Sequence, residues 1–336
     1  MAASSFDATT TPLIDVHAHV VLEGTMGAAG TYGPTLVEQP PSFQVGEYVL
    51  DGVAYRGTPF MEVDLRLAAM AAAGIDHQVL SPNPLTYLHH IDAAEAIAFC
   101  RRHNDELAEL LADHPERLSG FAALPLQQPS AAARELSRAV AELGLLGGYV
   151  GIDSAAGQLD DPAMDELYAA CVELEVPLFI HPAPDGIDGP PADPRLARWN
   201  LDLLLGFAAQ ETLAVLTLIY GGVLHRHPDL DICVSHGGGA VPYLFGRLDA
   251  AAQKRPWAPD WLAEPGVFGQ LLSRLWFDCH VHDPAALGLL ADRVGSDRIV
   301  FGTNFSGWDQ GAAMDLGDLT VDIRANTARL LGFGNP

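Results

Sequence analysis

The feature that most constrains the fold is the regular alternation of strand-like and helix-like segments along the chain. Short runs rich in β-branched and aromatic residues recur, and segments of helical composition separate them. We expect eight strands, at residues 13–19, 76–80, 118–123, 149–152, 176–180, 232–235, 275–278 and 299–302. Strands that alternate with helices form parallel sheets covered by those helices. The sequence therefore predicts an α/β fold, a (β/α)8 TIM-type barrel.

Nothing in the sequence divides the chain into separate domains. No linker rich in Pro, Gly or Ser interrupts the alternation, and its 336 residues fit one barrel with insertions. Residues 21–60 are irregular, with a hairpin expected at residues 49–55. We interpret residues 21–60 as an insertion after the first strand that covers the barrel mouth. The whole chain, residues 1–336, is expected to form a single domain.

Local signals mark three helix boundaries. Gly74 follows a helical run and is expected to cap its C-terminus, since glycine readily adopts the left-handed conformation. Ser130 is a candidate N-cap before an alanine-rich run. Asp161-Pro162 opens a later helix with proline at the first helical position.

Composition excludes some classes of partner. Hydrophobic residues make up 49% and charged residues 18% of the chain, which is typical of a globular protein with a large core. The formal net charge of −25 argues against nucleic acid or an anionic membrane surface as a partner. It leaves open a small anionic substrate, because a site can be locally positive.

Cysteine use and the N-terminus bear on location. The four cysteines are widely spaced, so we expect them to be reduced and mostly buried. Residues 1–11 have neither a basic region nor an apolar core, and we expect no apolar run of membrane-spanning length. These features favour a soluble, cytoplasmic protein.

Two histidines end the first strand, in the run Leu13-Ile14-Asp15-Val16-His17-Ala18-His19. Side chains alternate faces along a strand, so His17 and His19 should project the same way. Two imidazoles that converge are most simply explained by a metal ion. The alternative is a coincidental pair on an edge strand.

Further polar residues follow later strands. His181 comes after strand five, His236 after strand six, and Thr303-Asn304 after strand eight. Catalytic residues of such barrels lie at the C-terminal ends of the strands, so these positions should share one mouth. A single histidine after a strand is more often a satisfied core residue. Four histidines at the ends of three strands favour the metal-site interpretation.

These motifs together resemble a known family. The H-x-H, the lone His181, the run Ser235-His236-Gly237-Gly238-Gly239-Ala240 and the Gly302-Thr303 pair before Asn304-Phe305 are similar to the amidohydrolase superfamily. More narrowly, they resemble its aminocarboxymuconate-semialdehyde decarboxylase branch, which includes aromatic-acid decarboxylases. The likeness extends to Gly222-Val223, His227-Pro228, Phe245-Gly246-Arg247, Val281-His282-Asp283-Pro284 and the segment from Asp51-Gly52 to Arg56.

The resemblance implies roles for individual residues. His17, His19 and His181 would bind a divalent metal, zinc first and manganese second. His236 would be the general acid/base beside a metal-activated water. Arg56 would hold a substrate carboxylate, and Arg247 would enter the neighbouring subunit's site in a homodimer.

The sequence departs from the family pattern at the fourth metal ligand. The family has an aspartate after strand eight where this chain has Asn304. An amide can coordinate through its carbonyl oxygen but brings no negative charge. Asp309 and Asp278 could compensate, although loop polarity and capping explain them equally well. Phe305-Ser306 and Ala183-Pro184 also differ from the family and are expected to reshape the substrate pocket.

A second H-x-H pair, His280 and His282, follows strand seven. Both histidines would be solvated unless His280 reaches the substrate. The sequence as a whole predicts a metal-dependent, non-oxidative decarboxylase of a small unsaturated or aromatic acid. The alternatives are a hydrolase of the same fold that cleaves a C–C, ester or thioester bond, and a ligand-binding protein that has lost its metal.

Overall fold

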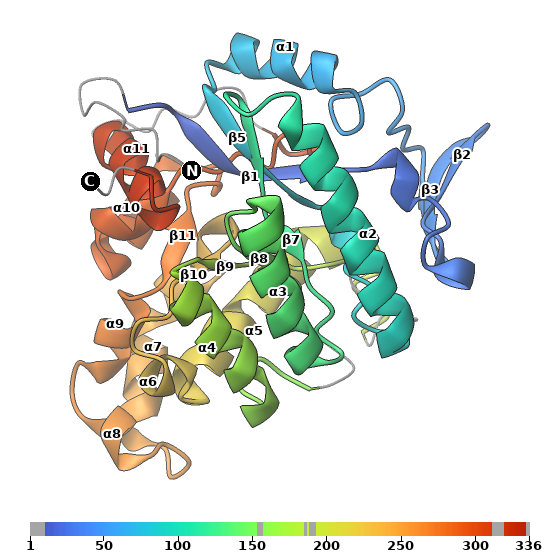
Figure 1. The fold of residues 1–336 in the computed structure, drawn as a ribbon. Coiled ribbons are helices and arrows are strands. Elements are labelled where there is room, and N and C mark those ends of the chain that lie inside the picture. Colours follow the sequence, from blue (N-terminus) through green and yellow to red (C-terminus); the bar gives the residue numbers. More distant parts are fainter. Residues whose placement is uncertain (1–10, 153–156, 185–186, 188–192, 311–318, 334–336) are drawn as a thin grey trace.

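The computed structural model describes residues 11–152, 157–184, 187, 193–310 and 319–333 (Figure 1). In this part of the chain, the parallel strands follow one another in sequence order. They are β1 (Ile14–Val20), β5 (His77–Pro82), β6 (Leu118–Gly120) with β7 (Ala122–Ala123), β8 (Gly148–Val150), β9 (Leu178–Ile180), β10 (Ile232–Val234), β11 (Trp276–Asp278) and β12 (Ile299–Val300). Parallel pairing joins β1, β5 and β6, and then β7 through β12, each strand with the next.

Backbone hydrogen bonds connect these two ladders. β6 and β7 are halves of one strand, and Phe121 between them donates its N–H to the Leu80 carbonyl (2.8 Å). On the other side, the Val16 N–H donates to the carbonyl of Phe301, the residue after β12 (3.0 Å). The first and last strands therefore meet. The predicted α/β fold of TIM-barrel type is confirmed.

Alternate residues of the strands supply two hydrophobic cores. The inner core contains residues from strands all around the barrel: Ile14, Val16, Val79, Phe121, Tyr149, Phe179, Cys233, Trp276 and Val300. The outer core packs the opposite faces of the strands against the helices. This two-sided burial explains why the strands are apolar runs, as expected for a parallel sheet covered on both faces.

Helices surround the strands (Figure 1). They are α1 (Val63–Ala73), α2 (Ala93–Ala112), α3 (Pro129–Leu143), α4 (Asp165–Leu174), α5 (Phe207–Tyr220), α6 (Val223–Arg226), α7 (Val241–Lys254), α8 (Asp260–Ala263), α9 (Val267–Leu272), α10 (Pro284–Val294) and α11 (Leu319–Leu330). Gly74 caps α1 with φ 70°, as predicted. Ser130 is not the N-cap of α3, because that helix begins at Pro129 after Gln128.

Short helices join these elements: η1 (Glu23–Thr25), η2 (Gly30–Tyr32), η3 (Pro84–Thr86), η4 (Pro162–Met164), η5 (Asp202–Gly206), η6 (His236–Gly238) and η7 (Ser296–Arg298). Asp161 opens η4, where its side chain accepts a hydrogen bond from the Ala163 N–H (2.8 Å), as its pairing with Pro162 predicted.

The insertion after β1 is a small antiparallel sheet of β2 (Thr35–Glu38), β3 (Pro41–Val45) and β4 (Tyr48–Asp51). The predicted hairpin at 49–55 is wrong, because residues 49–51 form its second strand and the turn lies at Gly46-Glu47. Gly46 has φ 57°, which lets the chain reverse there. Phe43 and Val45 are buried with Leu85 and Phe99. The insertion therefore packs beside the connection from β5 to α2, near the C-terminal end of β1.

One expectation about composition needs correction. The helical run Asp202–Tyr220, which spans η5 and α5, is long and apolar enough to cross a membrane by length and composition, with mean hydropathy 1.6. This is weak evidence for a membrane span, since core helices of soluble proteins meet the same criterion. The run carries Glu211, whose side chain is buried and accepts a hydrogen bond from Ser235, directly after β10. The prediction about a targeting segment concerns residues 1–11, of which residues 1–10 lie outside the described residues.

Candidate metal centre and active site

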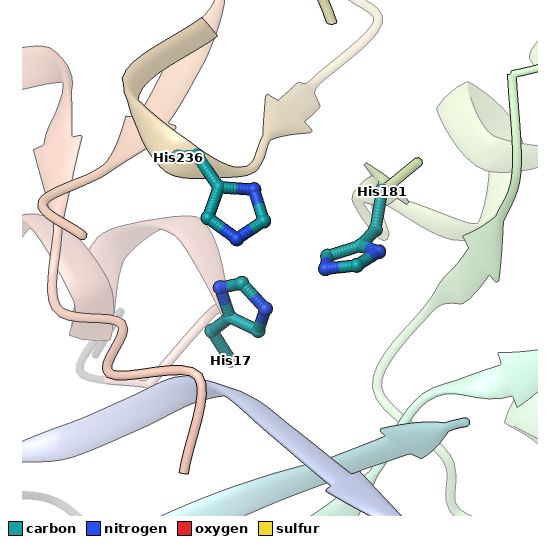
Figure 2. A group of neighbouring side chains, drawn as sticks. All are labelled: His17, His181 and His236. Carbon is teal, nitrogen blue, oxygen red and sulfur yellow. The ribbon is translucent and has the colours of Figure 1, made fainter. Parts of the chain in front are cut away.

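The histidines predicted at the ends of strands one, five and six lie together. His17 and His19 project from β1, and His181 directly follows β9. The ring centroids are 4.8 Å apart for His17 and His181, 4.7 Å for His19 and His181, and 5.1 Å for His17 and His19. Figure 2 shows His17, His181 and His236 turned toward one point. Parallel strands that end at one rim bring these side chains together.

One nitrogen of each of His17, His19 and His181 is already used, and the other is left free. The acceptors at Nδ1 are Asp278 Oδ2 for His17 (2.7 Å), the Pro82 carbonyl for His19 (3.0 Å) and the Pro182 carbonyl for His181 (2.6 Å). Because these atoms accept, each Nδ1 carries the proton and each Nε2 presents a lone pair. All three Nε2 atoms are buried and have no hydrogen-bond partner among the described residues.

Three converging, desolvated lone pairs cost free energy unless something binds them. Burial lowers the pKa of all three imidazoles, to about 3 for His19, so they are neutral at pH 7. Neutral imidazoles that donate Nδ1–H to a carboxylate or carbonyl are the usual form of histidine ligands. The three side chains therefore fit a divalent metal ion.

A buried polar network supports β1 beneath these histidines, and sequence reasoning missed it. Asp15 accepts hydrogen bonds from Thr303 Oγ1 (2.7 Å) and Gln78 Nε2 (3.0 Å). Arg66, fully buried, donates to Gln78 Oε1 (2.9 Å) and to the His19 carbonyl (2.6 Å). Burial raises the pKa of Asp15 to about 6. A carboxylate inside an otherwise apolar strand was the signal available in the sequence.

His236 has a different environment from the other three. Its Nδ1 donates to Glu211 Oε1 (2.5 Å), and Ser235 Oγ donates to the same oxygen (2.5 Å). Burial lowers the pKa of His236, but the Glu211 carboxylate outweighs it and raises the pKa to about 9. The His236 ring lies 4.9 Å from that of His17. Glu211 was not predicted; an acidic residue within an apolar helix was its only signal.

The glycines after His236 allow the tight turn that aims it. Gly237 has φ 62° and Gly239 has φ 65°. A Cβ on Gly237 would lie 2.5 Å from Val281, and one on Gly239 would lie 2.2 Å from the Ala208 carbonyl. Neither position accepts a larger residue. The run of glycines is therefore required by packing around the site.

Asn304, Asp309 and His280 form a second cluster beside His236. Asn304 Nδ2 donates to Asp309 Oδ1 (2.7 Å), and His280 Nε2 lies 3.1 Å from Asp309 Oδ2. Burial raises the pKa of Asp309, but hydrogen bonding by His280 outweighs it and holds the pKa well below its usual range. Asp278, the other proposed compensating carboxylate, instead binds His17.

Two sets of described side chains place their ligand atoms within 4.8 Å of one another. The first is His17, His181 and His236, and the second is His236, His280 and Asp309. His19 lies outside the first set by this criterion, although its free Nε2 is buried beside it. His236 belongs to both sets, so geometry alone permits it to be a ligand as well as an acid/base.

A cavity of about 390 Å³ opens next to His236. The polar residues that line it include Glu211, His236, His280, His282, Asn304 and Asp309. Its walls are largely apolar and include Leu203, Phe207, Tyr243, Leu290 and Trp308. No Lys or Arg is among these lining residues of the described chain. A flat apolar ring fits such walls, with imidazoles and an amide to orient its polar groups.

Neither of the two predicted arginines is among the residues that line the cavity. Arg56 is paired with Glu23 (2.5 Å) and Glu38 (2.9 Å) on the surface and does not line the cavity. Two carboxylates pair with its guanidinium, and its role in holding a substrate carboxylate stays a prediction. Arg247 is exposed on α7.

Two further positions where the sequence differs from the family pattern, Phe305 and Ala183, lie outside the lining of the cavity. Phe305 is buried and lies under the Arg66 guanidinium, 5.3 Å from ring centroid to Cζ, so it packs in the core. Gln210 Nε2 donates a hydrogen bond to the backbone carbonyl of Ala183 (2.8 Å). Neither lines the described cavity. The prediction that these positions reshape the substrate pocket is not supported by that cavity.

Comparison with known proteins gives the family. The sequence profile described as Amidohydrolase matches residues 14–330. The chain belongs to the amidohydrolase family. This agrees with the resemblance seen in the histidine motifs.

Several relatives and solved structures are decarboxylases. The chain is 29% identical to 2-amino-3-carboxymuconate-6-semialdehyde decarboxylase of Dictyostelium discoideum, over 87% of this chain and 81% of that protein. It is 36% identical to gamma-resorcylate decarboxylase of Rhizobium sp. (strain MTP-10005), over 55% of this chain and 58% of that protein. A solved 5-carboxyvanillate decarboxylase from Novosphingobium aromaticivorans matches with TM-score 0.72 and 26% identity, covering 82% of each chain. That structure is an aspartate-to-asparagine variant with bound manganese and 3-methoxy-4-hydroxy-5-nitrobenzoic acid.

Proposed function

We propose that this protein is a metal-dependent, non-oxidative decarboxylase of a small aromatic or unsaturated carboxylic acid. One observation carries the proposal: three buried histidines present unpartnered Nε2 atoms to one point, beside an imidazole held by a buried carboxylate. The relatives named as decarboxylases support the reaction type. Hydrolysis by the same fold remains the second candidate reaction.

His17, His19 and His181 would hold the ion through Nε2, with Asn304 as the fourth ligand, and the ion would polarise a substrate oxygen. Three imidazole ligands suit zinc, and manganese is the ion in the matched 5-carboxyvanillate decarboxylase. Zinc is our first proposal and manganese the second.

The protein's own residues supply a proton. Loss of CO₂ leaves the bonding electron pair on the substrate carbon, which must then accept a proton. His236 lines the cavity, and its Nδ1–H is held by Glu211, so Nε2 is the atom that exchanges a proton with substrate. The apolar walls hold the ring and exclude water. Exclusion of water strengthens each polar contact inside the cavity.

The test is CO₂ release. Protein loaded separately with zinc and manganese is expected to release CO₂ from at least one member of a panel of hydroxybenzoic and unsaturated dicarboxylic acids. Ester and thioester substrates, assayed in parallel, test the hydrolase alternative. Protein purified without added metal that contains none, binds none and still binds aromatic acids would instead support the ligand-binding alternative.

We also propose a homodimer in which Arg247 reaches the partner's site. Arg247 lies on α7 near the exposed Tyr243 (83%), and η5 exposes Leu204 (53%) and Leu205 (56%). Such apolar side chains around a cavity entrance are typical of an interface. Cytoplasmic localisation is part of the proposal, supported by four buried, unpaired cysteines.

Mixed variants test the dimer. Neither His236→Ala nor Arg247→Ala homodimers should be active, but mixing them should restore part of the activity, because some heterodimers contain one intact site. Light scattering gives the oligomeric state, and tagged subunits measure exchange. A monomer in solution, or no recovery despite demonstrated exchange, would contradict the arrangement.

A further inference from the structure

The loop after β12 carries a carboxylate, Asp309, next to the position where the family pattern has an aspartate and this chain has Asn304. Asn304 stands where relatives of its branch were expected to have an aspartate, and Asp309 follows five residues later in the same loop. The Phe305 N–H donates to the His17 carbonyl (3.0 Å), which holds the start of this loop against β1. This bond sets the backbone next to Asn304 against His17, and Asn304 lines the cavity together with His236.

The Asp309 carboxylate uses both oxygens on residues of the cavity. Oδ1 accepts from Asn304 Nδ2 (2.7 Å), and Oδ2 lies 3.1 Å from His280 Nε2 and 3.4 Å from His282 Nε2. Because the amide nitrogen of Asn304 faces Asp309, its carbonyl oxygen is on the other branch of the amide. Asp309 thus selects which end of Asn304 is available as a ligand.

The Asp309 carboxylate is largely shielded from water and pairs with imidazoles. Its side chain is 13% exposed, and its ion-pair partners among the described residues are imidazoles, with no Lys or Arg. A carboxylate held this far from water is costly unless a positive charge lies close by. A divalent ion at the histidines, one amide away, would provide that charge.

We propose that Asp309 is the carboxylate of this metal site and acts through Asn304. It positions the amide with its oxygen toward the ion and keeps a negative charge one hydrogen bond from the ligand. Asp309 is a positioning residue in this role, and the ligand it serves is a divalent cation. This rests on the proposed function only in requiring that the histidines bind metal.

The same carboxylate also anchors a wall of the cavity. His280 is bound by Asp309 and lies with its ring centroid 5.5 Å from that of His236. Loss of the carboxylate would therefore release Asn304 and His280 together. An isolated surface aspartate would have no such effect on two elements.

The test exchanges the two side chains. Asp309→Asn removes the charge, and the paired variant Asn304→Asp with Asp309→Asn restores it on the other side of the same hydrogen bond. Asparagine and aspartate both tolerate the left-handed conformation of residue 304 (φ 49°), so the exchange adds no backbone strain. Asp292→Asn, on the exposed face of α10, is the charge-matched control.

Affinity for zinc and manganese is measured by competition with a chelator, in the absence of substrate. Asp309→Asn is expected to weaken binding roughly 10- to 100-fold, the usual effect of losing a residue that orients a ligand. The paired variant should return to near wild-type affinity, and Asp292→Asn should leave it unchanged. The absorption spectrum of the cobalt form should change in Asp309→Asn, since the Asn304 ligand loses the negative charge beside its amide.

Wild-type affinity in Asp309→Asn, or a paired variant as weak as Asp309→Asn, would overturn the proposal. Should Asp309→Asn fail to fold, the affinity of the paired variant decides alone. The outcome is separable from the proposed reaction: a protein that binds metal but decarboxylates no acid refutes the function and leaves this test intact.

Discussion

Replacing His17 by alanine is expected to remove bound metal and to lower kcat/KM by about a thousandfold or more, since a metal ion supplies several kcal/mol of transition-state stabilisation. His17 is fully buried, and its Nε2 is one of the three unpartnered atoms at the centre of the cluster. Its Nδ1 donates to Asp278 Oδ2 (2.7 Å), which fixes the orientation of the ring, so Nε2 is the only nitrogen of His17 that can bind the ion. The two remaining imidazoles, those of His19 and His181, should bind the ion too weakly for it to stay bound through purification.

Metal content after dialysis, measured by mass spectrometry, checks this expectation. His225→Ala is the control, because His225 is exposed and stacks on Trp261 away from the cluster. Circular dichroism should show an unchanged fold, since residues at the barrel mouth carry function more than stability. Full metal content in His17→Ala would refute the ligand assignment.

Replacing His236 by alanine is expected to lower kcat by roughly 10²- to 10⁴-fold, the usual contribution of a positioned acid/base, while bound metal remains. His236 lines the cavity, and its Nδ1 is held by Glu211. Whether the metal is retained decides between an acid/base role and a ligand role for His236. His236 also belongs to a set of side chains that could bind an ion, so loss of metal in this variant would make it a ligand instead.

Glu211→Gln separates the two parts of the His236 dyad. The Glu211 carboxylate is what raises the pKa of His236 to about 9, against the effect of burial. Removal of that charge should move the titration of His236 to lower pH in the metal-free protein. Histidine NMR signals followed over pH measure the shift. An unchanged His236 pKa in Glu211→Gln would contradict the ion pair.

The sequence predicted the elements of the fold because they depend on neighbouring residues. Apolar runs identify buried strands, and the structure has strands at all eight predicted places in the described chain. Gly74 marks the end of α1 through its own backbone conformation. The hairpin turn was misplaced because two glycines, Gly46 and Gly52, offer similar local signals and packing of Phe43 selects the first.

The histidine positions were also evident from the chain alone. The alternation of side chains in β1 aims His17 and His19 together, and the barrel rim brings His181 and His236 to the same place. The role of Arg56 was assigned from resemblance alone; the structure pairs Arg56 with Glu23 and Glu38, and its role toward the substrate stays a prediction.

Only the tertiary structure decided how these histidines are held and which side chain pairs with Asn304. Asp278 contacts His17 across 261 positions of sequence, and Glu211 contacts His236 across 25. No periodicity or spacing encodes such pairs, because they depend on which helix and which loop pack against each strand. Asp309 is near Asn304 in sequence, but the hydrogen bond that joins them depends on how the loop folds over β1. Local patterns determined the barrel and its histidines, whereas long-range packing determined their protonation, their orientation and the charge around them.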